Sequence, residues 1–283
     1  MAIMFNFSTL FNSVAPHYED KILPILKPLA QSLIEWAAPY PNGQILDVGT
    51  GTGIVARLIA PSATRVFAVD MASQMVYVAK QKAKPLENVQ IIQADNHALP
   101  FADNSFDVVI SSFGLNATHP RRVFKEIWRV LKPNGKFILQ EWSILHTFDR
   151  IVIETIEVFM VDDEDAPIEL VQLRNFLAED NNGWYSHIQT QMDYADELRA
   201  AGFNRLLITE GNFSHIKLDL NTFIKYKLAW TSLASELAAM DPSARGDCLD
   251  KMRSELQYYL DNSGMLNYAP SLFRVQASKP HLS

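Results

Sequence analysis

The sequence predicts an α/β protein built around a mainly parallel sheet. Apolar runs of strand length alternate several times with helix-like segments between residues 44 and 142. A glycine-rich turn stands between the first strand-like run and the first helix-like one. This alternation is typical of βαβ units, in which a helix leads from each strand to the next parallel one. The chain has 283 residues, 48% of them hydrophobic, which is ample apolar material for a large core.

The individual elements follow from the hydrophobic pattern. Residues 17–38 carry a helical apolar stripe that Pro24 and Pro28 interrupt. Short apolar runs predict strands at 44–48, 65–69, 89–94, 106–112 and 135–142, and amphipathic patterns predict helices between them at 54–60, 73–83 and 120–131. Beyond residue 142 the pattern predicts a helix at 150–161. Residues 194–220 are predicted to form a helix, a turn at Gly202 and a strand. Two helices divided by Pro242 are predicted within 221–262, followed by a closing strand at 271–278.

Composition excludes several classes of protein. The net charge of −7 argues against a nucleic-acid partner, because phosphate binding needs a basic face. A single cysteine, Cys248, excludes an intrachain disulfide and a Cys-rich metal site. No run reaches about 18 apolar residues, and the N-terminal segment lacks the basic start of a signal peptide. We therefore expect no membrane span and a cytoplasmic protein.

The turn "ILDVGTGTG" at 45–53 is the most informative stretch. A dinucleotide-binding turn needs glycine or alanine where Ile54 stands, and a P-loop needs a Gly-Lys-Ser/Thr that is absent. Asp47 precedes the first glycine and would repel a bound anion. Asp70 ends the second strand, where a ribose diol is often bound. The pattern favours a cationic nucleoside such as S-adenosylmethionine, with helix capping as the alternative role for Asp47 and for Asp70.

Four segments together resemble the class I S-adenosylmethionine-dependent methyltransferases, and most closely their small-molecule group of ubiquinone/menaquinone methyltransferases and natural-product methyltransferases. The segments are "ILDVGTGTG", "VFAVDMASQMVYVAKQKA", "IIQADNHALPFADNSFDVVISSFGL" and "EIWRVLKPNGKFIL". The resemblance is strong over 44–141 and diffuse elsewhere. "HYED" at 17–20 also resembles an N-terminal element of the family, with Glu19 where Asp is usual.

The resemblance implies a Rossmann-like fold with a mostly parallel seven-stranded sheet and helices on both faces. We expect a single methyltransferase domain over 1–283. Its predicted parts are a core at about 40–142, 193–218 and 268–280, an N-terminal helical cover at 1–39, and helical lid insertions at 143–192 and 219–267.

The resemblance also implies roles for individual residues. Asp47 and the glycine turn would hold the methionine part of the cofactor, and Asp70 would bind the ribose hydroxyls. Asp95 would accept a hydrogen bond from the adenine amine, with the Asn96 backbone N–H nearby. The expected cofactor-binding residues are Tyr18, Asp47, Gly49, Thr50, Gly51, Gly53, Asp70, Met71, Met75, Asp95, Asn96, Ser111 and Phe113.

Two residues are candidates for catalysis. His119 stands where the chain leaves the sheet, and it could serve as a general base or only as a helix cap. Glu141 ends the fifth strand, where it could orient or deprotonate the acceptor or simply be buried with a hydrogen-bonded partner. The histidines show no metal-ligand spacing, so we expect no metal.

The function implied is methyl transfer from S-adenosylmethionine to an oxygen, nitrogen or carbon atom of a small, hydrophobic acceptor, with release of S-adenosylhomocysteine. Aromatic residues of the insertions would form an apolar lid, with most of the rings in the core of that lid. They are Phe148, Phe159, Phe176, Trp184, Tyr185, Phe223, Tyr226 and Trp230. Two alternatives stay open: an enzyme that uses the same cofactor without net methyl transfer, and a non-catalytic subunit that binds it to regulate a partner.

Overall fold

A computed structural model describes residues 5–37, 43–179 and 183–281. The ends of the predicted N-terminal cover, at 1–4 and 38–39, and the predicted start of the core at residue 40 lie outside these ranges.

The centre of the molecule is a seven-stranded sheet with the order β3-β2-β1-β4-β5-β9-β6. Its strands are β1 (Gln44–Val48), β2 (Arg65–Asp70), β3 (Val89–Gln93), β4 (Phe106–Ser112), β5 (Leu131–Trp142), β6 (Asn204–Gly211) and β9 (Leu272–Ser278). The five strands from β3 to β5 are parallel, whereas β9 runs antiparallel to both of its neighbours. The predicted Rossmann-like, mostly parallel sheet is confirmed.

Helices cover both faces of the sheet because successive strand residues point to opposite sides. Ile45 packs with α2 (Leu23–Ala37), α3 (Ile54–Ile59) and α4 (Ser73–Ala83) on one face. Leu46 packs with α5 (Pro120–Val130) and α9 (Gln191–Ala200) on the other. A 3₁₀ turn at Ala60–Ser62 follows α3.

The helical part of the N-terminal cover is nearly continuous, and it begins at Phe7, well before the predicted helical stripe at 17–38. It comprises α1 (Phe7–His17), a π-helical turn (Tyr18–Ile22) and α2. Pro24 and Pro28 do not break α2, contrary to the interruption that the sequence suggested. Pro24 lies in the first turn, where proline is tolerated, and Pro28 lies on a helix whose apolar side is buried.

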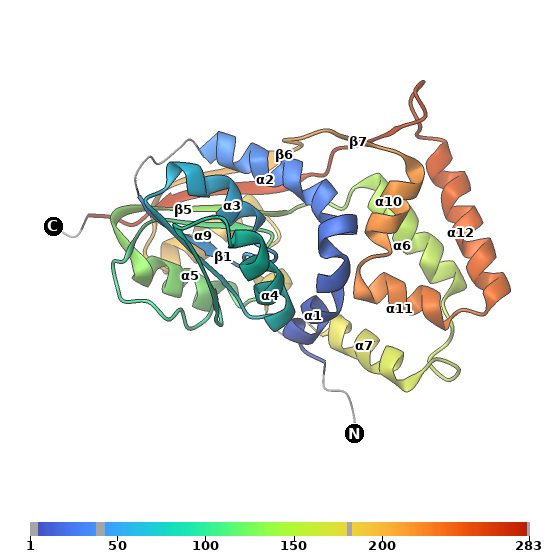
Figure 1. Ribbon diagram of the computed structural model, residues 1–283. Coiled ribbons are helices and arrows are strands. Elements are labelled where there is room, and N and C mark those ends of the chain that lie inside the picture. Colours follow the sequence, from blue (N-terminus) through green and yellow to red (C-terminus); the bar gives the residue numbers. More distant parts are fainter. Residues whose placement is uncertain (1–4, 38–42, 180–182, 282–283) are drawn as a thin grey trace.

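The predicted lid segments form a group of helices at one end of the sheet, together with α1 (Figure 1). They are α6 (Thr147–Phe159), α7 (Ile168–Ala178), α10 (Leu220–Lys227), α11 (Thr231–Ala239) and α12 (Pro242–Gln257). The short helix α8 (Trp184–His187) differs from the predicted lid, because Trp184 packs in the core with Phe124 of α5 and Tyr194 of α9. No helix in the described ranges is long and apolar enough to cross a bilayer.

Two details of this group differ from the prediction. The block at 221–262 contains three helices, not two, because the backbone at Trp230 is extended (φ −80°, ψ 133°) and separates α10 from α11. Strands β7 (Ile216–Leu218) and β8 (Leu266–Tyr268) pair as a separate two-stranded sheet. Three-residue strands leave too short a pattern in the sequence to be predicted.

At the carboxyl edge of the sheet, the chain leaving β1 meets the chain leaving β4. Gly49 has a φ of +69°, and a Cβ there would lie 2.4 Å from the Gly114 carbonyl oxygen. A Cβ at Gly114 would in turn lie 2.6 Å from the Gly49 oxygen. Both positions therefore require glycine for close approach, and Gly49 also for its left-handed conformation.

We predict that Gly49→Ala lowers the free energy of unfolding by about 2 kcal/mol or more, because it adds both a backbone clash and an unfavourable φ. Gly246→Ala is the matched control. Gly246 lies inside α12, and a Cβ added there would meet no atom within 4 Å, so alanine should stabilise the protein by about 0.5–1 kcal/mol. Urea denaturation of both variants checks this. Equal effects would contradict the close approach at Gly49.

Candidate active site

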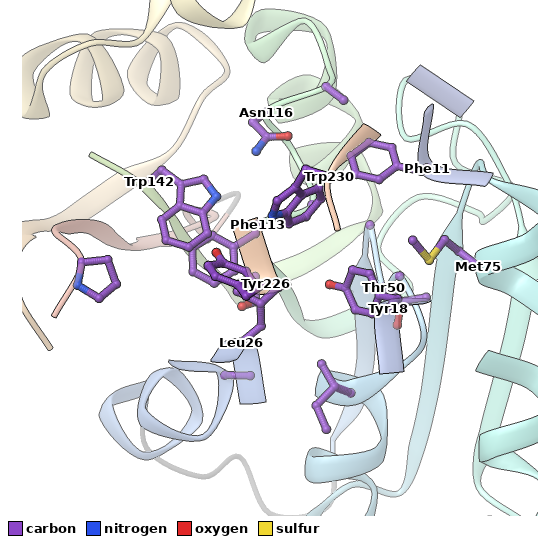
Figure 2. A pocket seen from close by; sticks show the side chains of 18 of the residues that line it. Phe11, Tyr18, Leu26, Thr50, Met75, Phe113, Asn116, Trp142, Tyr226 and Trp230 are labelled. Carbon is purple, nitrogen blue, oxygen red and sulfur yellow. The ribbon is translucent and has the colours of Figure 1, made fainter. Parts of the chain in front are cut away.

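A cavity of about 530 Å³ opens at the carboxyl edge of the sheet. Its walls are formed by the segments that follow β1 to β5, by the N-terminal helical cover and by the lid segments. Figure 2 shows Tyr18 and Thr50 on one side of it and a group of aromatic rings, including Phe113, Trp142 and Trp230, on the other. The cavity therefore has a polar, glycine-lined half and an aromatic half.

Asp47 is buried at the base of the glycine turn. Its Oδ2 accepts hydrogen bonds from the Thr50 hydroxyl (2.5 Å) and from the Ala56 backbone N–H (3.0 Å). Its Oδ1 is buried and has no hydrogen-bond partner among the described residues. Burial raises the pKa of Asp47 to about 7. One oxygen thus serves as the helix cap considered from the sequence, and the other is left for a ligand.

Asp70 holds the same turn from the end of β2. Its Oδ2 accepts from the Gly51 N–H and its Oδ1 from the Ala72 N–H, both at 2.9 Å. Burial outweighs these hydrogen bonds and raises the pKa of the carboxyl. Each carboxylate oxygen can accept a second hydrogen bond, so the structural role and the predicted ribose contact are compatible.

Tyr18 lies over the glycine turn from the first position of the π-helical turn. A Cβ on Gly51 would lie 3.7 Å from the Tyr18 hydroxyl oxygen, so this loop and this ring nearly touch. Burial and the neighbouring carboxyls of Asp70, Glu19 and Asp47 raise the pKa of Tyr18, which keeps the phenol neutral.

The aromatic half begins at the ends of β4 and β5. Phe113 has a φ of +60°, a conformation that costs energy for a side chain with a Cβ. Its ring stacks on Trp142 with centroids 4.2 Å apart. The strained backbone therefore aims this ring along the cavity wall, and Asn96 lies on the same wall with its Oδ1 buried and without a hydrogen-bond partner among the described residues.

The structure brings most of the predicted cofactor residues to the cavity. Those that line it are Tyr18, Asp47, Gly49, Thr50, Gly51, Asp70, Met71, Met75, Asn96 and Phe113. Of the aromatic residues expected in the lid, Tyr185, Tyr226 and Trp230 also line it.

Three predicted cofactor residues do not line the cavity. Gly53 begins α3 at a φ of +86° and lets that helix approach Ala79 of α4. Asp95 is exposed, and its carboxylate accepts a hydrogen bond from the His97 N–H at 2.8 Å. Ser111 is fully buried and donates to the Val48 carbonyl, whereas its neighbour Ser112 faces the cavity.

His119 also lies off the cavity wall. It precedes α5 at the N-cap position, its backbone N–H donates to His97 Nε2 at 2.8 Å, and its ring packs on His187 with centroids 5.1 Å apart. Burial, His187 and His97 lower the pKa of His119. His119 thus occupies the N-cap position, but its side chain caps no backbone N–H of α5, and its Nδ1 is buried without a hydrogen-bond partner among the described residues. No group of three or more His, Cys, Asp or Glu in the described ranges is arranged to hold a metal ion.

Glu141 is buried behind the cavity wall. It accepts hydrogen bonds from the Leu115 N–H (3.1 Å) and the Asn116 side chain (3.3 Å), and Asn116 lines the cavity. Burial raises the pKa of Glu141 to about 7 in spite of these partners. Glu141 is thus placed to position the loop after β4, while its predicted part in catalysis stays a prediction.

Sequence reasoning missed a polar group in the lid half of the cavity. Asp149, Lys227 and Tyr268 line the wall there, next to Tyr226 and His146. They come from α6, α10 and β8, and no motif joins them. Asn116 was also missed, although it follows the end of β4 at the carboxyl edge, where ligands bind in open α/β sheets.

The fold and the cavity at its carboxyl edge define a class of α/β proteins that bind a nucleoside at the switch point of the sheet. A family model described as "Methyltransferase domain" matches residues 46–139. A ubiquinone/menaquinone biosynthesis C-methyltransferase UbiE from Bartonella quintana is 32% identical over 223 residues, covering 70% of this chain and 80% of that one. A UbiE protein from Geotalea daltonii is 35% identical over 150 residues, and the match spans 47% of this chain and 62% of that relative.

Solved structures agree on the fold. The chain matches a complex of the Haloferax volcanii Trm112 methyltransferase activator and a putative methyltransferase with a TM-score of 0.57 and 18% identity, covering 99% of this chain and 100% of the other. The chain belongs to the class I S-adenosylmethionine-dependent methyltransferases.

The residues present fit the cofactor of this family. S-adenosylmethionine offers an ammonium, a sulfonium and hydroxyl and amine donors. The cavity offers two buried acceptors without partners among the described residues, Asp47 Oδ1 and Asn96 Oδ1, and the carboxylate of Asp70.

We predict that the free protein loses stability as the pH rises from about 4 to 7. The folded state holds a proton on Asp47 up to a pKa of about 7, whereas the unfolded chain releases it near 3.8, so the folded state binds more protons in this window. Asp47→Asn should reduce that loss, by roughly 1–4 kcal/mol. Urea denaturation at several pH values measures it.

The control for this prediction is Glu164→Gln, which changes an exposed carboxyl. It should leave the pH dependence as in the wild type. A slope unchanged in Asp47→Asn would show that Asp47 is ionised in the free protein.

We predict that Glu141→Gln keeps methyl transfer within about threefold of wild type, because an amide retains an oxygen for the Leu115 N–H. Glu141→Ala should reduce it roughly tenfold or more, since it frees the loop that carries Asn116. The measurement is the initial rate of methyl transfer by the wild type and both variants, with an acceptor that the wild-type protein methylates. An equal loss in both variants would make Glu141 a base rather than a positioning residue.

Proposed function

We propose that this protein transfers a methyl group from S-adenosylmethionine to a small, hydrophobic acceptor in the cytoplasm and releases S-adenosylhomocysteine. The observation that carries the proposal is one cavity lined both by Asp47, whose Oδ1 is buried without a partner among the described residues, and by the aromatic wall of Phe113, Trp142 and Trp230. A donor with a cation and an apolar acceptor can both find complementary surfaces there.

The polar half of the cavity supports the donor assignment. Asp47 Oδ1 is suited to an ammonium group, which would replace the missing hydrogen-bond partner and favour the ionised carboxylate. The N–H groups of the glycine turn and the Asp70 carboxylate suit the remaining polar atoms. Tyr18 and Met75 give apolar and aromatic surface over the nucleoside.

The aromatic half supports the acceptor assignment. UbiE relatives are quinone methyltransferases by name, which fits an apolar ring as substrate class. A second cavity of about 480 Å³ adjoins the first, since Asn116, Tyr185 and Trp230 line both. An acceptor with an apolar extension has room to continue into it.

When bound, S-adenosylmethionine supplies a methyl group on a sulfonium that is already activated for transfer. The protein's contribution is then to align the acceptor and exclude water. Phe113 and Trp142 form a rigid stacked wall for this alignment. A cavity with room beyond the donor residues also favours an enzyme over a subunit that only binds the cofactor.

We predict that the wild-type protein binds S-adenosylmethionine and S-adenosylhomocysteine in calorimetric titrations. Asp47→Asn and Asp70→Asn should each weaken binding roughly 10- to 100-fold, because a hydrogen bond to a charged group is lost. Asp107→Asn is the matched control. Its carboxylate lies at the opposite edge of the sheet, where it pairs with Lys132, and its loss should leave binding unchanged.

Absence of binding by the wild type would end the methyltransferase proposal. If both ligands bind, product mass with hydrophobic phenols, amines and quinols separates the alternatives. Methyl transfer adds one CH₂ to the acceptor, an enzyme without net methyl transfer adds none, and a regulatory subunit gives no turnover.

A further inference from the structure

The lid half of the cavity contains a buried ion pair. Lys227 Nζ lies 2.8 Å from Asp149 Oδ1, and the two side chains are only 12% and 7% exposed. The Tyr268 hydroxyl donates to Asp149 Oδ2 at 2.9 Å. All three residues line the cavity, and they come from three lid elements, α6, α10 and β8.

This pair is an unexpected choice for the core of a lid. Its surroundings are aromatic, since the Phe148 and Phe223 rings pack against Tyr268. An apolar pair of similar volume generally stabilises such a place at least as well as two desolvated charges. Packing alone therefore does not account for a carboxylate and an ammonium at the cavity wall, and charged groups of this kind are frequent at functional sites.

Both charged groups retain unused hydrogen-bonding capacity. Asp149 Oδ1 is buried and pairs with Lys227 Nζ at 2.8 Å, and each carboxylate oxygen can accept a second hydrogen bond. An ammonium has three N–H donors. Lys227 Nζ lies beside Asp149 and 5.5 Å from the centre of the Tyr226 ring, and burial and the Lys227 charge lower the pKa of His146. The carboxylate can thus accept a further hydrogen bond, and the ammonium beside it can donate one.

We propose that Asp149 and Lys227 bind the hydroxyl group of a neutral, otherwise apolar acceptor. The hydroxyl donates to Asp149 Oδ1 and accepts from Lys227 Nζ, while Tyr268 holds the carboxylate in place. A carboxylate ligand is disfavoured by Asp149 and an ammonium ligand by Lys227, so the pair selects a neutral hydroxyl. This inference rests on the proposed function, and it narrows the acceptor class to hydroxylated apolar compounds.

The competing explanation is structural, since the pair also joins α6 to α10. The double variant Asp149→Leu/Lys227→Met separates the two roles, because it removes both charges and leaves no unpaired charge in the core. Lys225→Met and Glu154→Leu are matched controls on the same two helices. Lys225 and the Glu154 carboxylate are exposed.

The probes are 1-naphthol, naphthalene and 1-naphthoate, titrated into each protein with and without saturating S-adenosylhomocysteine. We expect the wild type to bind 1-naphthol roughly tenfold or more tightly than either comparison compound, because only the hydroxyl can both donate to the carboxylate and accept from the ammonium. The double variant should bind naphthol and naphthalene within about twofold of each other. The two control variants should keep the wild-type preference.

Equal binding of naphthol and naphthalene by the wild type, binding of neither, or a preference that persists in the double variant would each overturn the proposal. S-adenosylhomocysteine titration and thermal denaturation of every variant report independently on the donor half and on folding. If the wild type does not bind S-adenosylhomocysteine, the proposed function is contradicted. If it binds S-adenosylhomocysteine but shows no preference for naphthol, only this inference is contradicted.

Discussion

The contact between the backbones at Gly49 and Gly114 is the constraint on which the site depends. A Cβ on either residue would lie within 2.6 Å of the other's backbone oxygen, so the chains that leave β1 and β4 pass too close to each other for any side chain at these two positions. This close contact fixes the positions of the two chain segments that form the walls of the polar half of the cavity. The β1 turn presents Thr50 and Gly51, and the β4 exit presents Phe113 and, through the bond to the Gly114 oxygen, Asn96.

The same geometry concentrates negative charge. Asp47 and Glu141 are buried at this edge and Asp70 is partly exposed, desolvation raises the pKa of each, and none forms an ion pair among the described residues. A cationic ligand relieves that charge, and an anionic one adds to it. The lid half differs, because Asp149 there already has Lys227 as its partner. One cavity thus has an acidic end, which suits a cationic donor, and a polar end without net charge, which suits a neutral acceptor.

The core of the fold and half of the site were predictable because they depend on local patterns. Short apolar runs of strand length, the spacing of Gly49, Gly51 and Gly53, and carboxylates at strand ends are readable without tertiary knowledge. A prediction can be wrong by one residue where the sequence pattern does not indicate which side of the sheet a side chain faces. Ser112 faces the cavity instead of Ser111, since adjacent strand residues point to opposite sides. Asp95 turns outward because its carboxylate closes its own turn onto the His97 N–H.

The lid was less predictable for a physical reason that also bears on function. Lys225 and Lys227 stand two positions apart on one helix, with equal charge and length, yet one is exposed and the other is 12% exposed beside Asp149. The choice depends on how α10 docks against α6 and α12, which is a long-range packing outcome and not a local preference. The donor half is therefore specified by short-range sequence and the acceptor half by tertiary packing. Substitutions that repack the lid can change the acceptor while the donor site stays intact.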